Sequence, residues 1–194
     1  GVDKTVKRAV PLKVIRQIRD LDLTLSPMLD YAKDLFLFSF YTRGMSFVDM
    51  AYLKKKDLQN GVLAYRRQKT GQQLFIRWEK PMQEIIDKYD TSGTPYLLPI
   101  IRDMKEDARK QYKSEAHREN QSLKKIGKLL GLVIPLTSYV ARHSWASIAK
   151  SKNIPIATIS EAMGHDSENT TRIYLASLDT TVVDKANSLI LKSL

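Results

Sequence analysis

The 194-residue sequence contains no cysteine, which excludes disulfide bonds and thiolate metal ligands. It also lacks any apolar run that approaches the ~18–20 residues needed to cross a membrane. Its first residues, Gly1–Lys4, carry no apolar stretch of the kind that signal peptides contain. These absences argue against a disulfide-stabilised secreted protein and a membrane partner, and they favour a reducing, cytoplasmic setting.

Acidic residues are few in comparison with basic ones. The chain has 21 Asp and Glu against 32 Lys and Arg, a formal net charge of +11. Basic side chains that neutralise phosphates release condensed counterions, so an excess of this size favours a polyanionic partner. No lipid-anchor signal accompanies the charge, and we therefore expect nucleic acid rather than an anionic membrane surface.

The hydrophobic pattern predicts a mostly helical domain. Apolar patterns predict helices over residues 12–21, 27–40, 47–53, 81–89 and 181–192, with two or three more within 138–176. Charge alternation predicts a long polar helix over residues 103–130. Asn60-Gly61 predicts a tight turn, and strands are predicted at 62–65 and 74–78 with a turn at 69–72. We expect an α+β fold over residues 1–194, a single domain with a small antiparallel sheet.

Four segments carry side chains suited to phosphodiester chemistry. They are residues 42–50 (TRGMSFVDM), 66–71 (RRQKTG), 137–146 (TSYVARHSWA) and 164–174, which opens with Gly-His and ends at Tyr174. Guanidiniums clamp the non-bridging oxygens of a phosphate and stabilise the charge that grows when a nucleophile adds. A tyrosine hydroxyl can be that nucleophile, and a lysine can protonate the leaving 5′ oxygen. This chemistry needs no metal and no cofactor, and we expect neither.

Together the four segments resemble the catalytic domain of tyrosine recombinases of the phage-integrase type, over nearly the whole chain. In that family the nucleophilic tyrosine stands nine residues after the histidine of a Gly-His pair, as Tyr174 does after His165. The resemblance implies that Arg142 is the second catalytic arginine and that Lys69, in a hairpin turn, is the catalytic lysine. It also implies site-specific cleavage and rejoining of double-stranded DNA through a 3′-phosphotyrosine, with an N-terminal core-DNA-binding domain outside this chain.

Two positions depart from the family pattern. The family's first arginine, in Gly-x-Arg-x-x-Glu, aligns with Ser46, and we expect Arg43 to take its place. The alternative is that Arg43 is a surface residue and Ser46 supplies a weaker hydrogen bond. Tyr139 stands where the family has histidine; it either positions a phosphate oxygen or packs in the core, because tyrosine is a poor general base. His143 is a candidate phosphate contact or a structural residue.

Further alternatives concern the lysine, the C-terminal segment and the reaction itself. The basic run 54–56 competes with Lys69 for the role of proton donor. Residues 181–194 carry an apolar stripe that either docks on its own domain or packs on a neighbouring protomer, which would make a homo-oligomer, a tetramer, on DNA. The alternative functions are relaxation of one duplex, as type IB topoisomerases perform, and DNA binding without catalysis. All of them place the protein inside the cell, at the nucleoid.

Overall fold

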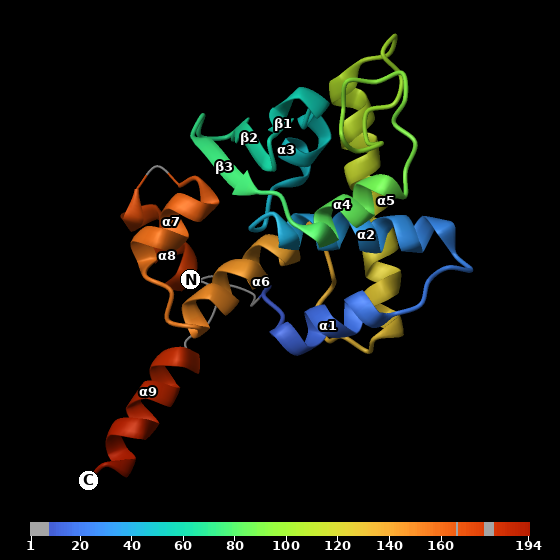
Figure 1. The fold of residues 1–194 in the computed structure, drawn as a ribbon. Coiled ribbons are helices and arrows are strands. Elements are labelled where there is room, and N and C mark those ends of the chain that lie inside the picture. The colour runs from blue at the N-terminus through green and yellow to red at the C-terminus, as the bar shows by residue number, and fades with distance from the viewer. Residues whose placement is uncertain (1–7, 166, 177–180) are drawn as a thin grey trace, which may run out of the picture.

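The computed structural model describes residues 8–165, 167–176 and 181–194, with the backbone alone described for residues 173–176 and 181–186. The fold is mostly helical, with one small sheet that lies beside α3 at one side of the molecule (Figure 1). The described elements are α1 (Leu12–Asp20), α2 (Pro27–Tyr41), α3 (Phe47–Tyr52), the 3-10 helix η1 (Lys55–Asp57), β1 (Leu58–Gln59), β2 (Val62–Arg66), β3 (Gln73–Arg77), α4 (Lys80–Asp87), α5 (Ala108–Leu129), α6 (Ser138–Ser151), α7 (Ile156–Met163), α8 (Glu168–Ala176) and α9 (Thr181–Lys192). The predicted mostly helical α+β class is confirmed.

The sheet is antiparallel, with strand order β1-β2-β3. Gln59 pairs with Val62, and the two residues between them, Asn60 and Gly61, have positive φ angles of 53° and 74°. Two consecutive positive φ angles define the tight hairpin turn that the Asn-Gly pair predicts. The pattern predicts two strands, and β1 is a third; its two residues are too few to show the alternation by which strands are recognised.

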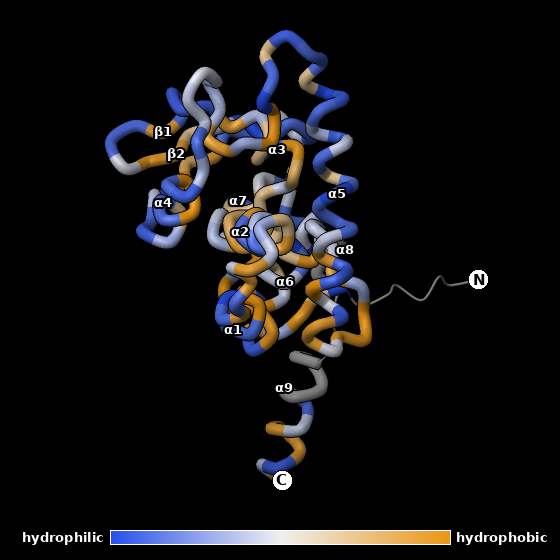
Figure 2. The backbone as a smooth tube through the Cα atoms, turned by 90° about the vertical axis from the view of Figure 1, so that its right-hand side faces the viewer, coloured by the Kyte–Doolittle hydropathy of each residue, from blue (hydrophilic) through white to orange (hydrophobic). Residues whose placement is uncertain are grey.

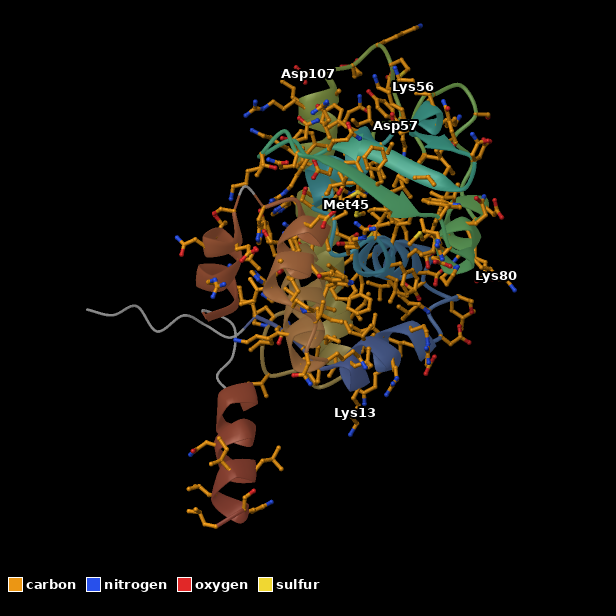
Figure 3. All side chains as sticks on the ribbon, turned by 60° about the vertical axis from the view of Figure 1, so that its left-hand side comes forward. Lys13, Met45, Lys56, Asp57, Lys80 and Asp107 are labelled. Carbon is orange, nitrogen blue, oxygen red and sulfur yellow. The ribbon has the colours of Figure 1, made fainter. Side chains whose placement is uncertain are left out.

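Helix α2 forms the centre of the molecule, where it packs against α4, α5 and α6. Its second half is apolar nearly all round, and residues 35–38 are each at most 4% exposed. Met45, just after the helix, is 2% exposed and lies in the interior, whereas Lys13 and Lys80 point outward (Figure 3). Each buried apolar side chain of this size contributes roughly 1.5–3 kcal/mol, so the position of residues 42–50 is held by the core.

Helix α5 begins five residues later than the pattern predicts. Its N-cap is Asp107, whose carboxylate accepts a hydrogen bond from the backbone N of Lys110 at 3.1 Å. Most of the helix is hydrophilic (Figure 2), and its buried side chains form one stripe that includes Leu123 and Ile126. The charge alternation of residues 103–107 continues that of the helix, so the sequence pattern does not show where the helix starts.

Three helices, α6, α7 and α8, occupy residues 138–176, within the predicted two or three. Helix α7 packs against both α6 and α8, and it ends at Gly164, whose φ angle is 68°. Helix α9 forms where the apolar stripe predicts a helix, and it projects away from the rest of the molecule (Figure 1). In the part of the chain that the structure describes, no helix is both long and apolar enough to cross a membrane.

Candidate active site

The turn between α2 and α3 lies directly against the backbone of α6. Gly44 has a φ angle of 74°, and a Cβ atom at this position would lie 2.6 Å from the Cα atom of Arg142. Its backbone N donates to the carbonyl of Ser39 at 2.8 Å, and the Ser39 hydroxyl donates to the carbonyl of Met45 at 2.6 Å. Glycine is therefore required at this position both for its left-handed backbone and for the close approach of α6.

Arg142 lies at the meeting point of three segments and is only 5% exposed. Its Nη1 donates to the carbonyl oxygen of Gly44 at 3.0 Å, and its Nη2 donates to that of Met163 at 2.9 Å. The same Nη2 lies 3.5 Å from Nε2 of His165. The planar guanidinium is thus held in one orientation by partners on two sides, which a lysine could not reproduce.

Contacts with the helices on either side of it, α7 and α8, orient His165. It directly follows Gly164, the left-handed C-cap of α7, and its backbone N donates to the carbonyl of Ser160 at 3.1 Å. Its Nδ1 lies 2.7 Å from Oγ1 of the fully buried Thr171. Because one ring nitrogen is engaged by Thr171, the other is presented toward Arg142.

Lys69 occupies the turn between β2 and β3, as predicted, and its side chain is exposed. The turn is closed by two backbone hydrogen bonds: the N of Gly71 donates to the carbonyl of Arg67 at 2.8 Å, and the N of Arg67 donates to that of Gln72 at 2.9 Å. The competing run 54–56 lies elsewhere, before β1, where it forms the start of η1.

Arg67 is a site residue that the sequence reasoning did not single out. It is 8% exposed, and its Nη1 donates to the carbonyl of Gly164 at 3.2 Å. Arg142 donates to the carbonyl of the preceding residue, Met163, so the two guanidiniums converge on the end of α7. The buried Nε of Arg67 has no hydrogen-bond partner among the described residues. Its signal in the sequence is the alternation Arg66-Arg67, of which one side chain must face inward.

Asp49 links α3 to the Lys69 turn. Its buried carboxylate accepts a hydrogen bond from the backbone N of Gln68 at 2.9 Å. Burial raises the pKa of this carboxyl, and the hydrogen bonds from Gln68 and Ser46 and the charges of Arg67 and Arg142 oppose that rise. The carboxyl therefore lies within the electrostatic reach of both buried guanidiniums.

Arg43 and Ser46 have defined partners outside this cluster. The Nη2 of Arg43 donates to the carbonyl of Phe75 at 2.8 Å, on β3, and the side chain lines a cavity of about 530 Å³ between β3 and helices α6 and α7. The Ser46 hydroxyl caps α3, where it accepts from the backbone N of Asp49 at 3.3 Å. Whether Arg43 or Ser46 replaces the family's first arginine stays a prediction, and the buried Arg67 is a third candidate for that role.

Tyr139 and His143 stand together on α6, with ring centroids 5.9 Å apart. Tyr139 is 59% exposed, so it is not a core residue, and its role toward a phosphate stays a prediction. Burial, together with the positive charges of Arg8 and Arg142, lowers the pKa of His143 to about 4. His143 is therefore a neutral imidazole at neutral pH.

Tyr174 belongs to helix α8, which packs against α6 and α7. Its side chain lies outside the described residues, so its contact with the scissile phosphate stays a prediction. In the described ranges, no cluster of three or more His, Asp or Glu residues has the arrangement of a metal site.

Comparison with known proteins identifies the family. Residues 13–181 match the family model described as "Phage integrase family", and the chain therefore belongs to this family of tyrosine recombinases. The chain is 29% identical to tyrosine recombinase XerA of Pyrococcus furiosus over 141 residues, which cover 69% of this chain and 46% of that protein. It is also 29% identical to tyrosine recombinase XerC of Rickettsia prowazekii over 138 residues, with 69% and 43% covered. The chain thus spans about half the length of the curated relatives it matches.

Solved structures show the same fold. The XerH site-specific recombinase bound to palindromic difH substrate matches with a TM-score of 0.64 at 18% identity, over 94% of this chain and 53% of that one. Lambda integrase (75–356), a dimer bound to a COC′ core site, matches with a TM-score of 0.58 at 18% identity, over 88% and 60%. At this level of identity the likeness establishes the fold.

Proposed function

We propose that the protein carries out site-specific DNA recombination or integration, in which Tyr174 cleaves and rejoins DNA through a 3′-phosphotyrosine. The observation that carries this proposal is the convergence of Arg142, Arg67 and His165 at the end of α7. Two buried guanidiniums and an imidazole at one point are suited to a phosphate and its developing negative charge. The helix that contains Tyr174 follows this point directly.

In the proposed reaction the oxygen of Tyr174 attacks the scissile phosphorus. The bond from phosphorus to the 5′ oxygen breaks as the bond to the tyrosine oxygen forms. Tyr174 releases its proton to water as it attacks, and the protonated Lys69 gives a proton to the leaving 5′ oxygen. Arg142 and Arg67 stabilise the non-bridging oxygens, and His165 adds a hydrogen bond to one of them. The ester keeps the bond energy, so the 5′-hydroxyl of a partner strand can reverse the step without a nucleotide cofactor.

The proposed partners are double-stranded DNA and further copies of the protein. Residues 1–194 would act as the catalytic domain, with their net charge of +11 attracting the DNA backbone. Among the solved structures of the same fold is a lambda integrase tetramer bound to a Holliday junction, with a TM-score of 0.54. Helix α9 supports assembly through the C-terminal segment, because Leu189, Ile190 and Leu191 are 67%, 65% and 56% exposed.

The proposal is tested by trapping the covalent intermediate. The full-length protein is incubated with DNA from the ends of its own element, nicked so that the released fragment diffuses away. We expect a protein–DNA adduct on denaturing gels that is lost in Tyr174→Phe and kept in Tyr112→Phe, a matched change on α5. Specific binding without an adduct would contradict the proposal and favour a DNA-binding module.

The reaction products distinguish recombination from the topoisomerase-like alternative. A recombinase joins strands from two different duplexes, whereas an enzyme of the topoisomerase type only relaxes one supercoiled circle. Two labelled duplexes of different length, mixed with the protein, therefore should give joined molecules of predicted length. Relaxation without such products would favour the topoisomerase-like alternative.

A further inference from the structure

One carbonyl oxygen joins the two halves of the candidate active site. The carbonyl of Gly164 accepts a hydrogen bond from Oγ1 of Thr70 at 2.9 Å, in addition to the one from Nη1 of Arg67 at 3.2 Å. Thr70 is the neighbour of Lys69 in the β2–β3 turn, and Gly164 is the neighbour of His165 in the turn that follows α7. The turn that carries the lysine is thus tied to the turn that carries the histidine.

Side-chain hydrogen bonds attach the Lys69 turn to its surroundings, in addition to the two backbone bonds that close it. Strand β2 ends at Arg66 and β3 begins at Gln73, so residues 67–72 lie beyond the paired register of the two strands. On one side of Lys69, the backbone N of Gln68 donates to the carboxylate of Asp49 at 2.9 Å. On the other side, the hydroxyl of Thr70 donates to the carbonyl of Gly164 at 2.9 Å, which ties this side of the turn to α7. Arg66 Nη1 also donates to the carbonyl of Gly71 at 3.1 Å, but that bond lies within the hairpin itself.

The acceptor of this hydrogen bond is itself firmly placed. Gly164 is the left-handed C-cap of α7, and a Cβ atom there would lie 3.2 Å from Leu74 and 3.3 Å from the side chain of Arg67. Its neighbour Met163 is fixed in turn by the hydrogen bond from Arg142. Because the carbonyl cannot move freely, the Thr70 hydroxyl that binds it helps to fix the position of the turn next to Lys69.

We propose that Thr70 is a positioning residue for Lys69, which acts through its hydrogen bond to the carbonyl of Gly164. The hydroxyl holds the turn against the end of α7, and this sets the direction from which the Lys69 ammonium reaches the 5′ oxygen. Proton transfer requires the donor within hydrogen-bond reach of the accepting oxygen, so a small displacement of the turn slows the step. The inference deepens the proposed function and rests on Lys69 being the proton donor.

Thr70 differs in this respect from the other anchors of the turn. Without its hydroxyl, the turn is still closed by the two backbone bonds between Arg67 and residues 71 and 72, and Gln68 is still bound to Asp49. The hairpin therefore remains folded while Lys69 gains freedom. Loss of the hydroxyl should impair protonation of the leaving group and spare the steps that depend on Arg142 and His165.

Two substrates distinguish protonation of the leaving group from the attack on the phosphate. In the first, the scissile phosphate has its ordinary 5′ oxygen; in the second, sulfur replaces that bridging oxygen. A thiolate is a far better leaving group than an alkoxide, since thiol pKa values lie near 8.5, and its departure needs no proton from the enzyme. Cleavage of the sulfur substrate under single-turnover conditions therefore reports attack without the contribution of Lys69.

The variants are Thr70→Val, which removes the hydroxyl and keeps the shape, Thr70→Ser, which keeps the hydroxyl, and Lys69→Ala. We expect Thr70→Val to cleave the oxygen substrate roughly 5- to 10-fold more slowly than the wild type, the effect of one hydrogen bond. It should cleave the sulfur substrate at the wild-type rate, and Thr70→Ser should resemble the wild type on both. Lys69→Ala should be slowed about 100-fold or more on the oxygen substrate and rescued by sulfur. Thr70→Ala is run beside Thr70→Val, so that poor folding of one variant leaves the comparison intact.

Two results would overturn the inference alone. One is wild-type cleavage of the oxygen substrate by Thr70→Val and Thr70→Ala; the other is an equal slowing of both substrates while Lys69→Ala is rescued by sulfur. If sulfur fails to rescue Lys69→Ala, the proton-donor role of Lys69 is wrong, and the positioning role of Thr70 is overturned with it.

Discussion

Nη2 of Arg142 lies 3.5 Å from Nε2 of His165, while the same Nη2 donates to the carbonyl of Met163 at 2.9 Å. The other ring nitrogen of His165 lies 2.7 Å from the hydroxyl of Thr171. Contacts within the protein thus orient both side chains. Donors that are oriented in advance stabilise a transition state without the cost of reorganisation, which makes this pair the best-defined part of the site.

Arg142→Lys should abolish most of the cleavage although the positive charge is kept. A lysine cannot bind the carbonyls of Gly44 and Met163 and still present donors to a phosphate. We expect single-turnover cleavage to fall about 100-fold or more, with a much smaller change in DNA affinity. A rate within a few-fold of the wild type would show that charge alone is sufficient at this position.

Gly44→Ala should destabilise the protein far more than an alanine at another left-handed glycine. The added Cβ would lie 2.6 Å from the Cα of Arg142, and the backbone is strained as well. We expect the free energy of unfolding to fall by about 2–4 kcal/mol in urea titrations. Gly131→Ala is the matched control: its φ angle is 67°, but nothing lies within 4 Å of the added atom, and a loss of about 1 kcal/mol is expected. Equal losses would contradict the close approach of α6.

The family pattern has an arginine at the position of Ser46, and three variants test which residue of this protein supplies a guanidinium in its place. We expect Arg67→Ala to lower cleavage about 100-fold, because Arg67 is buried beside the end of α7. Arg43→Ala should have a smaller effect, since its guanidinium is bound to the carbonyl of Phe75 on the outer strand, and Ser46→Ala should mainly weaken the cap of α3. A larger defect in Arg43→Ala than in Arg67→Ala would assign the role to Arg43.

The stability of the protein should depend on pH through His143. Burial lowers its pKa from 6.5 to about 4, so between these values the unfolded chain binds more protons than the folded one. The free energy of unfolding therefore falls as the pH drops from about 6.5 to about 4. Below about pH 4 the stabilisation that comes from the neutral His143 is lost completely. Comparison of the wild type with His143→Gln by urea titration should show a difference that changes by roughly 1–2 kcal/mol across this window, allowing for the partial exposure of the ring. A constant difference would mean that His143 does not titrate in this way.

Much of the fold could be predicted because its signals are local. The Asn60-Gly61 turn, the apolar second half of α2 and the left-handed end of α7 at Gly164 each depend on a few adjacent residues. The start of α5 and the two-residue strand β1 could not be predicted in this way. In those places the outcome depends on the cap at Asp107 and on pairing with β2, and neither has a periodic pattern.

In the candidate site, too, the residues with local sequence patterns could be predicted, and those that depend on long-range contacts could not. Spacing and resemblance predict Arg142, His165 and the turn position of Lys69, and the structure brings the first two together. Arg67 was missed because its function depends on Gly164, which lies 97 residues further along the chain. The Arg66-Arg67 pair indicates that one of the two side chains faces inward, but it does not show which one or what it contacts. The exposure of Tyr139 likewise depends on packing that a single sequence does not reveal.

In the proposed reaction, Tyr174 becomes covalently joined to the 3′ end of the cleaved strand. The most direct measurement is to digest the purified protein–DNA adduct with protease and nuclease and to locate the residual nucleotide by mass spectrometry. We expect one modified peptide that contains Tyr174, with the phosphate linked to a 3′ oxygen and a free 5′-hydroxyl on the released strand. A nucleotide on a different residue, or linkage through a 5′ phosphate, would contradict the account.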